Sequence, residues 1–266
     1  MVPVSFAFEV GGQEFRLVPD AGTGAGSDSG PDSGRGTQQG GAALYWPAEQ
    51  ALLVADLHLE KASHYARHGQ LLPPYDSRET LERLAAAVRT TGARRVYTLG
   101  DNFHDAGGPA RLEPYAAGML AALTTALDWV WVTGNHDETD CGGQDAERRA
   151  VCGGTFVEEL AIAGLVLRHQ AKAGETRPEL SGHFHPKVRL RLRQRHISRP
   201  CAVVSRGNGV AERMILPAFG ALTGGMDAAD PAIVEALQPA TRIDAILPAG
   251  GKAVCLPLWQ EARRST

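Results

Sequence analysis

The sequence has few of the features that mark membrane, secreted or strongly charged proteins. No apolar run approaches the roughly 18 residues of a membrane span. The first ten residues have no Lys or Arg before their apolar positions, unlike a secretory signal. The net charge is only −3 at pH 7, so any signal for nucleic acid must be local.

Cysteine is also scarce. The four cysteines, Cys141, Cys152, Cys201 and Cys255, lie far apart and form no C-x-x-C pair. This pattern indicates reduced thiols in a cytoplasmic protein rather than a disulfide framework. A bridge between Cys141 and Cys152 is compatible with the sequence, but nothing in the sequence requires one.

One long stretch lacks large apolar residues altogether. Residues 21–41 are rich in Gly and Ser, and such a segment cannot offset the entropy cost of ordering, so we predict a disordered insertion there. Strand patterns on both sides, at 14–18 and 43–46, show that it is not a domain boundary. With 266 residues and 43% hydrophobic content the chain can bury a sizeable core, and we expect one domain over residues 1–266.

The rest of the chain alternates between strand and helix patterns. Strands are predicted at residues 5–10, 14–18, 43–46, 51–55, 95–99, 129–133, 165–167, 242–247 and 252–256. One helix is predicted at 112–127, and another runs from Asp76, which with Glu79 resembles a capping box, to just before Gly92. This order is typical of an α/β fold, and we expect a layered β-sandwich flanked by helices.

Five short polar patches follow the strands or lie between them: V-A-D-L-H, L-G-D-N-F-H-D, T-G-N-H-D, L-R-H and G-H-F-H-P. Residues just past strand ends cluster at the carboxyl edge of such a sheet. One D-x-H is common by chance, but this ordered set is not, and it predicts a two-metal phosphoesterase site. Paired metals can make a nucleophile from water at neutral pH. The predicted metal ligands are Asp56, His58, Asp101, Asn135, His169, His183 and His185.

The chemistry of this set narrows the roles. Two Asp, one Asn and four His without Cys suit Mn²⁺, Fe or Zn²⁺ better than Ca²⁺. A shared anionic ligand holds two metals best, and Asp101 is the best candidate because it follows a strand and lies mid-order. The glycines before Asp101, Asn135 and His183 predict tight turns. His136 is predicted to protonate the leaving oxygen as general acid; the alternative is an orienting role.

The whole set resembles the calcineurin-like metallophosphoesterase superfamily over residues 52–186, through D-L-H, G-D, G-N-H-D, His169 and G-H-F-H. The resemblance implies that Asp101 joins two metal sites. Asp56, His58 and His185 would hold one metal with it. Asn135, His169 and His183 would hold the other.

A narrower resemblance is carried by G-D-N-F-H-D, G-H-F-H-P and L-P-A-F-G-A-L-T-G-G. These are similar to a bacterial subgroup known as ligase-associated DNA damage response endonucleases. The resemblance implies a manganese-dependent nuclease or phosphodiesterase in DNA repair, with DNA as substrate and a DNA-repair ligase or helicase as partner. At the fourth motif that subgroup has H-E-P, whereas this chain has His169-Gln170-Ala171.

Several further residues carry weaker signals. His104 and Asp105 are expected to contact substrate or support the metals, or else to cap a loop. His64, His68 and His196 are expected on the surface, although His64 and His68 lie close enough to the first motif to face the cleft.

A local basic signal follows the last metal motif. Residues 186–196 place four arginines at period two, which on a strand puts them on one face. We predict that they contact a phosphate backbone; the alternative is a solvated strand face. These arginines are Arg189, Arg191, Arg193 and Arg195.

The function most favoured is metal-dependent hydrolysis of phosphodiesters, with DNA as the leading substrate. One alternative is a phosphatase or phosphodiesterase acting on a small molecule. Another is a non-catalytic DNA-repair adaptor that keeps its metals for structure, although His136 argues against it, because a structural site needs no proton donor.

Overall fold

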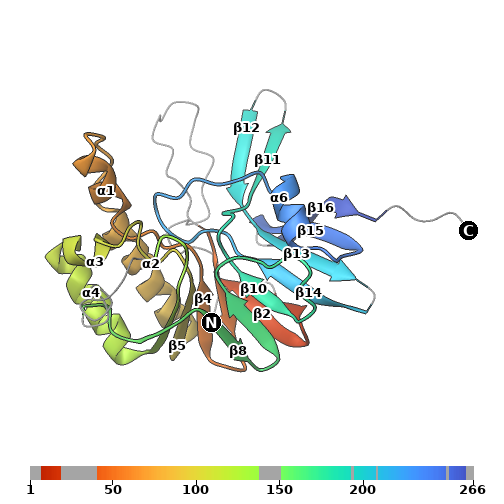
Figure 1. Cartoon of the computed structure of the whole chain (residues 1–266), viewed down its shortest axis with the longest axis horizontal. Coiled ribbons are helices and arrows are strands. Elements are labelled where there is room, and N and C mark those ends of the chain that lie inside the picture. Colours follow the sequence, from red (N-terminus) through yellow and green to blue (C-terminus); the bar gives the residue numbers. More distant parts are fainter. Residues whose placement is uncertain are drawn as a thin grey trace, which may run out of the picture.

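The computed structural model describes residues 7–18, 41–137, 151–192, 195–207, 209–249 and 252–261. Within them, two seven-stranded sheets pack face to face, with helices on their outer faces (Figure 1). This is the predicted layered α/β arrangement. The helices are α1 (Lys61–Arg67), α2 (Asp76–Thr91), α3 (Gly108–Arg111), α4 (Pro114–Ala126) and α6 (Pro231–Ala236).

The first sheet follows the order of the chain. Its strands are, in spatial order, β1 (Ala7–Val10), β2 (Gln13–Val18), β3 (Ala43–Trp46), β4 (Ala51–Val54), β5 (Arg95–Leu99), β6 (Asp128–Val132) and β7 (Thr155–Val157). The first four strands are antiparallel, and β4 to β7 are parallel. The strands predicted at 43–46 and 95–99 are therefore present with those bounds, and those at 14–18, 51–55 and 129–133 with ends shifted by one residue. The predicted strand at 5–10 is present from residue 7, and its first two residues lie outside the described residues.

The second sheet contains β16 (Lys252–Gln260), β15 (Arg242–Ala249), β13 (Ala202–Gly207), β14 (Val210–Ile215), β10 (Glu179–Ser181), β9 (Leu165–Arg168) and β8 (Glu159–Ile162), in that spatial order. Strands β9, β10 and β14 are parallel to one another. The predicted closing hairpin is the antiparallel pair β15–β16. A separate pair, β11 (Lys187–Leu192) and β12 (Arg195–Pro200), projects from the sandwich (Figure 1).

Apolar side chains fill the three interfaces between these layers. Between the sheets, Phe15 and Trp46 lie in one core with Leu167 and Val204. The outer face of the first sheet packs on α2 and α4, and that of the second sheet packs on α6. Burial on both faces explains why β4 and the first three residues of β9 are runs of apolar residues rather than alternating ones.

The parallel strands place the predicted ligands at one edge of the sandwich. Asp56, Asp101 and Asn135 come two or three residues after β4, β5 and β6. In the second sheet, His169 directly follows β9, and His183 follows β10 by two residues. Since parallel strands end at the same edge, residues far apart in the chain meet there.

Two predictions about helix starts were wrong. Helix α2 has Tyr75 at its N-cap and no side-chain cap, so Asp76 and Glu79 do not form a capping box. The Asp76 carboxylate instead accepts the N–H of Ala62 in α1, 3.1 Å away. The helix predicted at 112–127 begins at Pro114, because Glu113 caps it by accepting the N–H of Ala116, and the separate short α3 precedes it.

The predicted disordered insertion lies outside the described residues except for its last residue. Gly41 is held in place: its N–H donates to the carbonyl of Ala218 at 2.9 Å, and its carbonyl accepts a bond from Arg83. The insertion therefore ends at least one residue earlier than predicted. Strands β2 and β3, which flank it, are direct neighbours, with Val18 opposite Ala43.

Candidate metal centre

The backbone at the predicted ligands is unusual. Five of the seven adopt positive φ angles, a region that non-glycine residues enter at a cost and that concentrates at functional sites. Backbone hydrogen bonds hold these turns, with Asp56 N–H donating to the carbonyl of Gly100 and His58 N–H to that of Asp101. The five residues are Asp56, His58, Asp101, His183 and His185.

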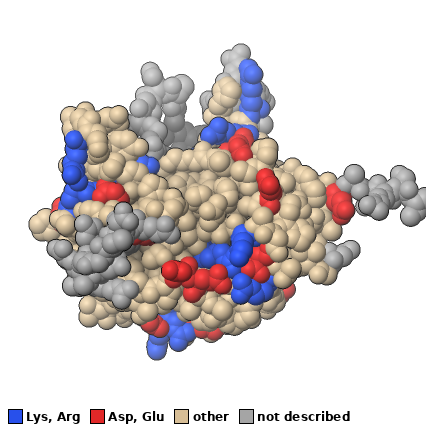
Figure 2. Space-filling view, in the orientation of Figure 1, with Lys and Arg blue, Asp and Glu red and all other residues tan. Residues whose placement is uncertain are grey.

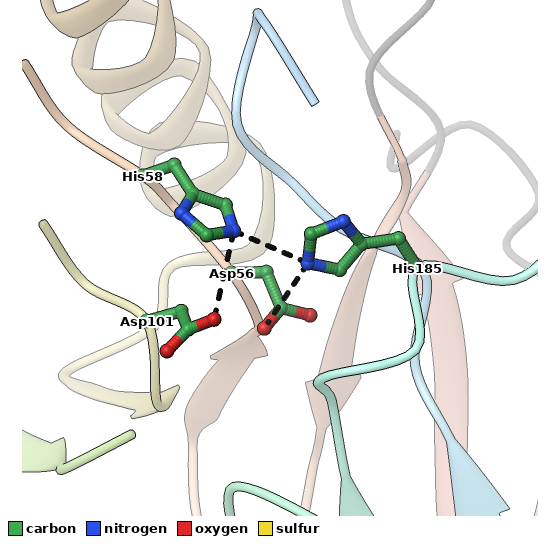
Figure 3. Close-up of side chains that lie close together, drawn as sticks. All are labelled: Asp56, His58, Asp101 and His185. Carbon is green, nitrogen blue, oxygen red and sulfur yellow. Dashed lines mark hydrogen bonds and ion pairs between the residues drawn. The ribbon is translucent and has the colours of Figure 1, made fainter. Parts of the chain in front are cut away.

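The first group of side chains consists of Asp56, His58, Asp101 and His185, whose ligand atoms all lie within 4.8 Å of one another. Figure 3 shows these four side chains pointing toward one another, with Asp56 and His58 on one loop and Asp101 and His185 on two others. The Nε2 atoms of His58 and His185 are 3.2 Å apart. His58 Nε2 is also 3.7 Å from Oδ2 of Asp101, and His185 Nε2 is 3.6 Å from Oδ1 of Asp56.

The second group consists of Asp101, His169 and His183. His169 Nε2 lies 3.0 Å from His183 Nδ1 and 3.4 Å from Asp101 Oδ1. The amide oxygen of Asn135 is 2.8 Å from the same His169 nitrogen, so Asn135 joins this group. Asp101 is common to both groups, as a bridging ligand must be.

The electrostatics of the two groups fit divalent cations. Burial lowers the pKa values of His58 and His183, which favours the neutral imidazole that metals bind. Burial also raises the pKa of Asp101, because a carboxylate this far from water needs a positive charge nearby. Converging imidazole nitrogens and buried carboxylates together match the donors that Mn²⁺, Fe and Zn²⁺ accept.

The glycines before three of the ligands are required by space. A Cβ atom on Gly100 would collide with the imidazole of His169, and one on Gly134 would collide with the backbone N of Asp101. A Cβ on Gly182 would meet the carboxylate of Asp56 at 2.7 Å. The predicted close approaches at these turns are therefore present.

The sequence interpretation missed Asp137, which belongs to the motif G-N-H-D but was given no role. Its buried carboxylate accepts hydrogen bonds from the N–H groups of Asn102, Phe103 and Gly134, at 3.1, 3.3 and 3.0 Å. These hydrogen bonds connect the loop that carries Asp101 to the loop that carries Asn135. The motif G-N-H-D could have indicated this role, because a further polar residue in a metal-binding loop often orients the ligands.

Comparison with known proteins gives the family. The model of the calcineurin-like phosphoesterase family matches residues 50–247, which include all the strands that carry the site. The chain belongs to this family. It is therefore a metal-dependent enzyme that hydrolyses phosphate esters and uses a centre of two metal ions. No curated protein sequence matches the chain.

Among solved structures, the phosphoesterase is similar to the Pseudomonas putida nuclease MPE. The TM-score is 0.62 and the identity 25%, and the match covers 95% of this chain and 100% of that one. A protein of unknown function from Aquifex aeolicus, AQ665, matches 51% of this chain and 77% of its own at 16% identity, with a TM-score of 0.35. In the described part of the phosphoesterase, no helix is both long and apolar enough to cross a membrane, and Cys201 and Cys255 are free thiols.

His136 lies against the metal centre of the phosphoesterase. Its backbone N–H donates to Oδ1 of Asp101 at 3.0 Å, and its ring Nε2 is 4.0 Å from Oδ2 of the same residue. The ring is 41% exposed, so a leaving group can reach it from solvent. This position is compatible with the predicted role as general acid.

A cluster of rings adjoins His136. The ring of His104 stacks on His136 at 5.3 Å and on Tyr65 at 5.5 Å, and it meets His64 edge-on at 4.7 Å. His64 is half-buried against Asp105 and His104, in line with the alternative that it faces the cleft, whereas His68 and His196 are exposed as expected. Burial is the largest cause that lowers the pKa of His104, to about 4.

The carboxylate of Asp105 is bound by neighbouring side chains. Arg111 binds both its carboxylate oxygens, at 2.8 and 2.6 Å, and His64 Nδ1 lies 2.7 Å from Oδ2. Burial opposes the charge, but the bonds from Arg111 and His64 outweigh it and lower the pKa of Asp105 to about 2. Asp105 also accepts the N–H of Gly107, which favours the loop-capping alternative.

The predicted arginine strand is in fact a hairpin. Arg189 and Arg191 lie on β11, Arg193 is outside the described residues, and Arg195 begins β12, opposite Leu192. The four arginines therefore do not follow one strand, because β11 and β12 are separate antiparallel strands. Arg189 and Arg191 remain exposed, and Lys and Arg side chains gather along the projecting hairpin (Figure 2).

Proposed function

We propose that this phosphoesterase is a manganese-dependent nuclease that hydrolyses phosphodiester bonds of DNA in DNA repair. The observation that carries the proposal is the basic hairpin, which begins two residues after the candidate ligand His185. Among the described residues, no carboxylate pairs with Arg189 or Arg191. Arg189 donates only to the neutral carbonyl of Gly225, so its charge is free for phosphate.

The similarity to a nuclease over nearly the whole chain supports the same substrate class. The phosphate backbone of DNA extends beyond the bond that is hydrolysed, so cations a few residues from the metal centre could bind its neighbouring phosphates. The resemblance to the DNA damage response subgroup supports cytoplasmic action beside a DNA-repair ligase or helicase.

Different residues of the site have different roles in the proposed reaction. When bound, the two metal ions activate water and offset the charge of the phosphate. Asp101, with the two groups around it, would hold both ions. His136 would give a proton to the leaving oxygen, a role worth typically 10²–10⁴-fold.

The test uses purified protein with Mn²⁺ on closed circular single-stranded DNA, duplex DNA and a chromogenic phosphodiester. We expect DNA cleavage that a chelator abolishes and added Mn²⁺ restores. Asp101→Ala, purified in parallel, controls for contaminating nucleases and should be inactive. Hydrolysis of the small diester without cleavage of either DNA would contradict the proposal.

A second candidate, a small-molecule phosphodiesterase, is favoured by one observation. A cleft of about 450 Å³ adjoins Asn135 and His169 and extends to Lys172, and its volume suits a ligand the size of a nucleotide. Its lining also includes Glu158 and Glu159, which would repel a polyanionic strand. Cyclic and linear dinucleotides in the same assay separate the two candidates.

A further inference from the structure

A stack of three rings leads from the proposed general acid His136 to the helix α1. The ring of His104 lies 5.3 Å from that of His136 at an interplanar angle of 19°, and 5.5 Å from that of Tyr65 at 25°. Among the described residues no ring contact joins Tyr65 directly to His136, so His104 lies between them. Near-parallel rings at these distances attract one another, and the stack ends at Tyr65.

Side-chain hydrogen bonds hold the part of α1 that carries this ring. Nδ1 of His64 lies 2.7 Å from Oδ2 of Asp105. Arg111 binds both oxygens of Asp105 and also donates to Ser63 Oγ at 3.0 Å. The two residues before Tyr65 are therefore tied to the loop that follows His104. A ring held in this way costs little ordering entropy when a ligand binds to it.

The end of the stack is accessible from solvent. Tyr65 is half-buried, and the next three residues of the chain are exposed. In the part of the chain that the structure describes, its ring contacts are with His104 and with His64, which it meets edge-on at 5.6 Å. The segment after α1 exposes further apolar side chains, with Leu71 88% and Tyr75 65% exposed. Apolar and aromatic surface that is exposed in one segment suits contact with another molecule.

The position of the stack relates it to one side of the substrate. His136 would protonate the leaving oxygen, so the rings that continue from it lie beside the leaving group. The basic hairpin begins two residues after another candidate ligand, His185. Figure 1 shows α1 and this hairpin projecting from the same edge of the sandwich at separate places. The hairpin offers cations for phosphates, whereas α1 offers a ring, which suits a base.

We propose that Tyr65 is a substrate-binding residue whose ring stacks on the base of the nucleotide that leaves. The inference rests on the proposed action on DNA and adds to it a contact that a phosphodiester without bases cannot make. Every base has an aromatic face, so the contact favours nucleotides without selecting a sequence. It also holds the leaving nucleotide beside the ring of His136.

The experiment uses three dinucleotides, each with a single phosphodiester bond. One is thymidylyl-thymidine, and the others lack the base of one residue or of the other. Mn²⁺-loaded parent protein is compared with Tyr65→Leu, Tyr65→Phe and the control Tyr115→Leu, which removes an exposed tyrosine from α4. The products show which residue leaves without the phosphate. We expect kcat/KM of the parent to fall about 5- to 100-fold when the leaving residue has no base, the effect of one base–aromatic stack.

The variants separate stacking from a structural role. Tyr65→Leu should show the same loss on the complete dinucleotide and no further loss when the leaving residue has no base. Tyr65→Phe and Tyr115→Leu should behave as the parent protein. An equal loss by Tyr65→Leu on all three dinucleotides would overturn the proposal, as would a parent protein that is indifferent to the leaving base. Melting temperature and Mn²⁺ content are recorded, and Tyr65→Met replaces Tyr65→Leu if the latter does not fold.

A second measurement tests the stack even if the proposed action on DNA fails. Where no dinucleotide is hydrolysed, oligothymidylate and the same chain without bases are compared as inhibitors of the hydrolysis of a chromogenic phosphodiester. Tyr65→Leu should weaken inhibition by oligothymidylate about 5- to 100-fold and leave inhibition by the chain without bases unchanged. Equal inhibition of the parent protein by the two chains would overturn the proposal.

Discussion

Nδ1 of His136 lies 3.0 Å from the backbone carbonyl oxygen of His104. A carbonyl oxygen only accepts hydrogen bonds, so Nδ1 carries the proton and Nε2 faces the carboxylate of Asp101. The main chain of His104 therefore sets the tautomer and the orientation of His136. A proton taken up on Nε2 points toward the metal centre.

This geometry leads to a prediction for His136→Ala. Both metals should stay, because the ring is not in either ligand group, and turnover should fall by roughly 10²–10⁴-fold. The loss should be much smaller for a nitrophenyl ester, since nitrophenolate leaves without a proton. Steady-state rates on the two ester types, with metal content measured in parallel, provide the check. An equal loss on both would indicate an orienting role instead.

The position of Asp101 in both ligand groups gives a second prediction. Asp101→Ala should lose both metals and nearly all activity, whereas Asp56→Ala or His183→Ala should lose mainly one metal each. Metal analysis of the purified proteins measures this. The control is Asp128→Ala, an exposed carboxylate at the opposite end of β6. Full metal occupancy in Asp101→Ala would show that another group bridges the ions.

The convergence of the candidate ligands was largely predictable from sequence because local signals place most of them. The strands that lead to Asp56, Asp101, Asn135 and His169 were predicted, and glycines precede Asp101, Asn135 and His183. Strand β10, Glu-Leu-Ser, which leads to His183 and His185, was not predicted because it has no strand pattern. Parallel strands must bring such residues to one edge. Strand ends and turn glycines depend on neighbouring residues in the chain, so they can be recognised in a single sequence.

The contacts that were missed join residues distant in the chain. His64 meets Asp105 41 residues away, and Asp76 caps a helix other than its own. The local pattern around Asp76 looked like a capping box, but burial against α1 gave its carboxylate a different set of donors. The arginine repeat was misread because arginines at every second position look the same in the sequence whether they lie on one strand or on the two strands of a hairpin.

The ion pair of Asp105 with Arg111 gives a prediction on pH and stability. The folded-state pKa of Asp105, about 2, is below its ordinary 3.8, so the pair stabilises the fold above pH 3.8 and stops doing so as the pH falls through 2. In metal-free protein at pH 6, Asp105→Asn should lower the free energy of unfolding by on the order of 2 kcal/mol.

Urea unfolding of wild type and variant between pH 6 and pH 2.5 measures this difference. The gap should narrow steadily below pH 4. The variant Asp128→Asn, whose carboxylate is 68% exposed, is the control for removing an acidic group from the surface. A gap that stays constant down to pH 2.5 would mean that the pair does not lower the pKa of Asp105.

The flanks of the glycine- and serine-rich insertion give a fourth prediction. Because Val18 and Ala43 are paired neighbours, a short turn can replace residues 19–40 without moving β2 or β3. Gly41 should be kept, since Ala218 and Arg83 bind its backbone. Melting temperature and metal content should be almost unchanged. A large drop in melting temperature would show that the segment packs on the fold.

The last prediction concerns the basic hairpin. Arg189 and Arg191 are alternate residues of β11, so their Cα atoms lie about 6.7 Å apart on one face, a spacing at which both can reach one phosphate backbone. Converting both to Gln should weaken DNA binding similarly for all sequences, because phosphate contacts carry no base information. The slope of log K against log salt should shrink by about 0.7–0.9 per lost contact.

Two comparisons make the hairpin result specific. Hydrolysis of a small phosphodiester should be spared in the double variant, since that substrate needs only the metal centre and its immediate surroundings. Arg89→Gln, which removes an exposed arginine from the last turn of α2, should leave both binding and its salt slope unchanged. If the hairpin variant also binds DNA with an unchanged slope, the arginines are a solvated face. The cleft beside His169 would then become the better guide to the substrate, and a small phosphodiester would replace DNA as the leading proposal.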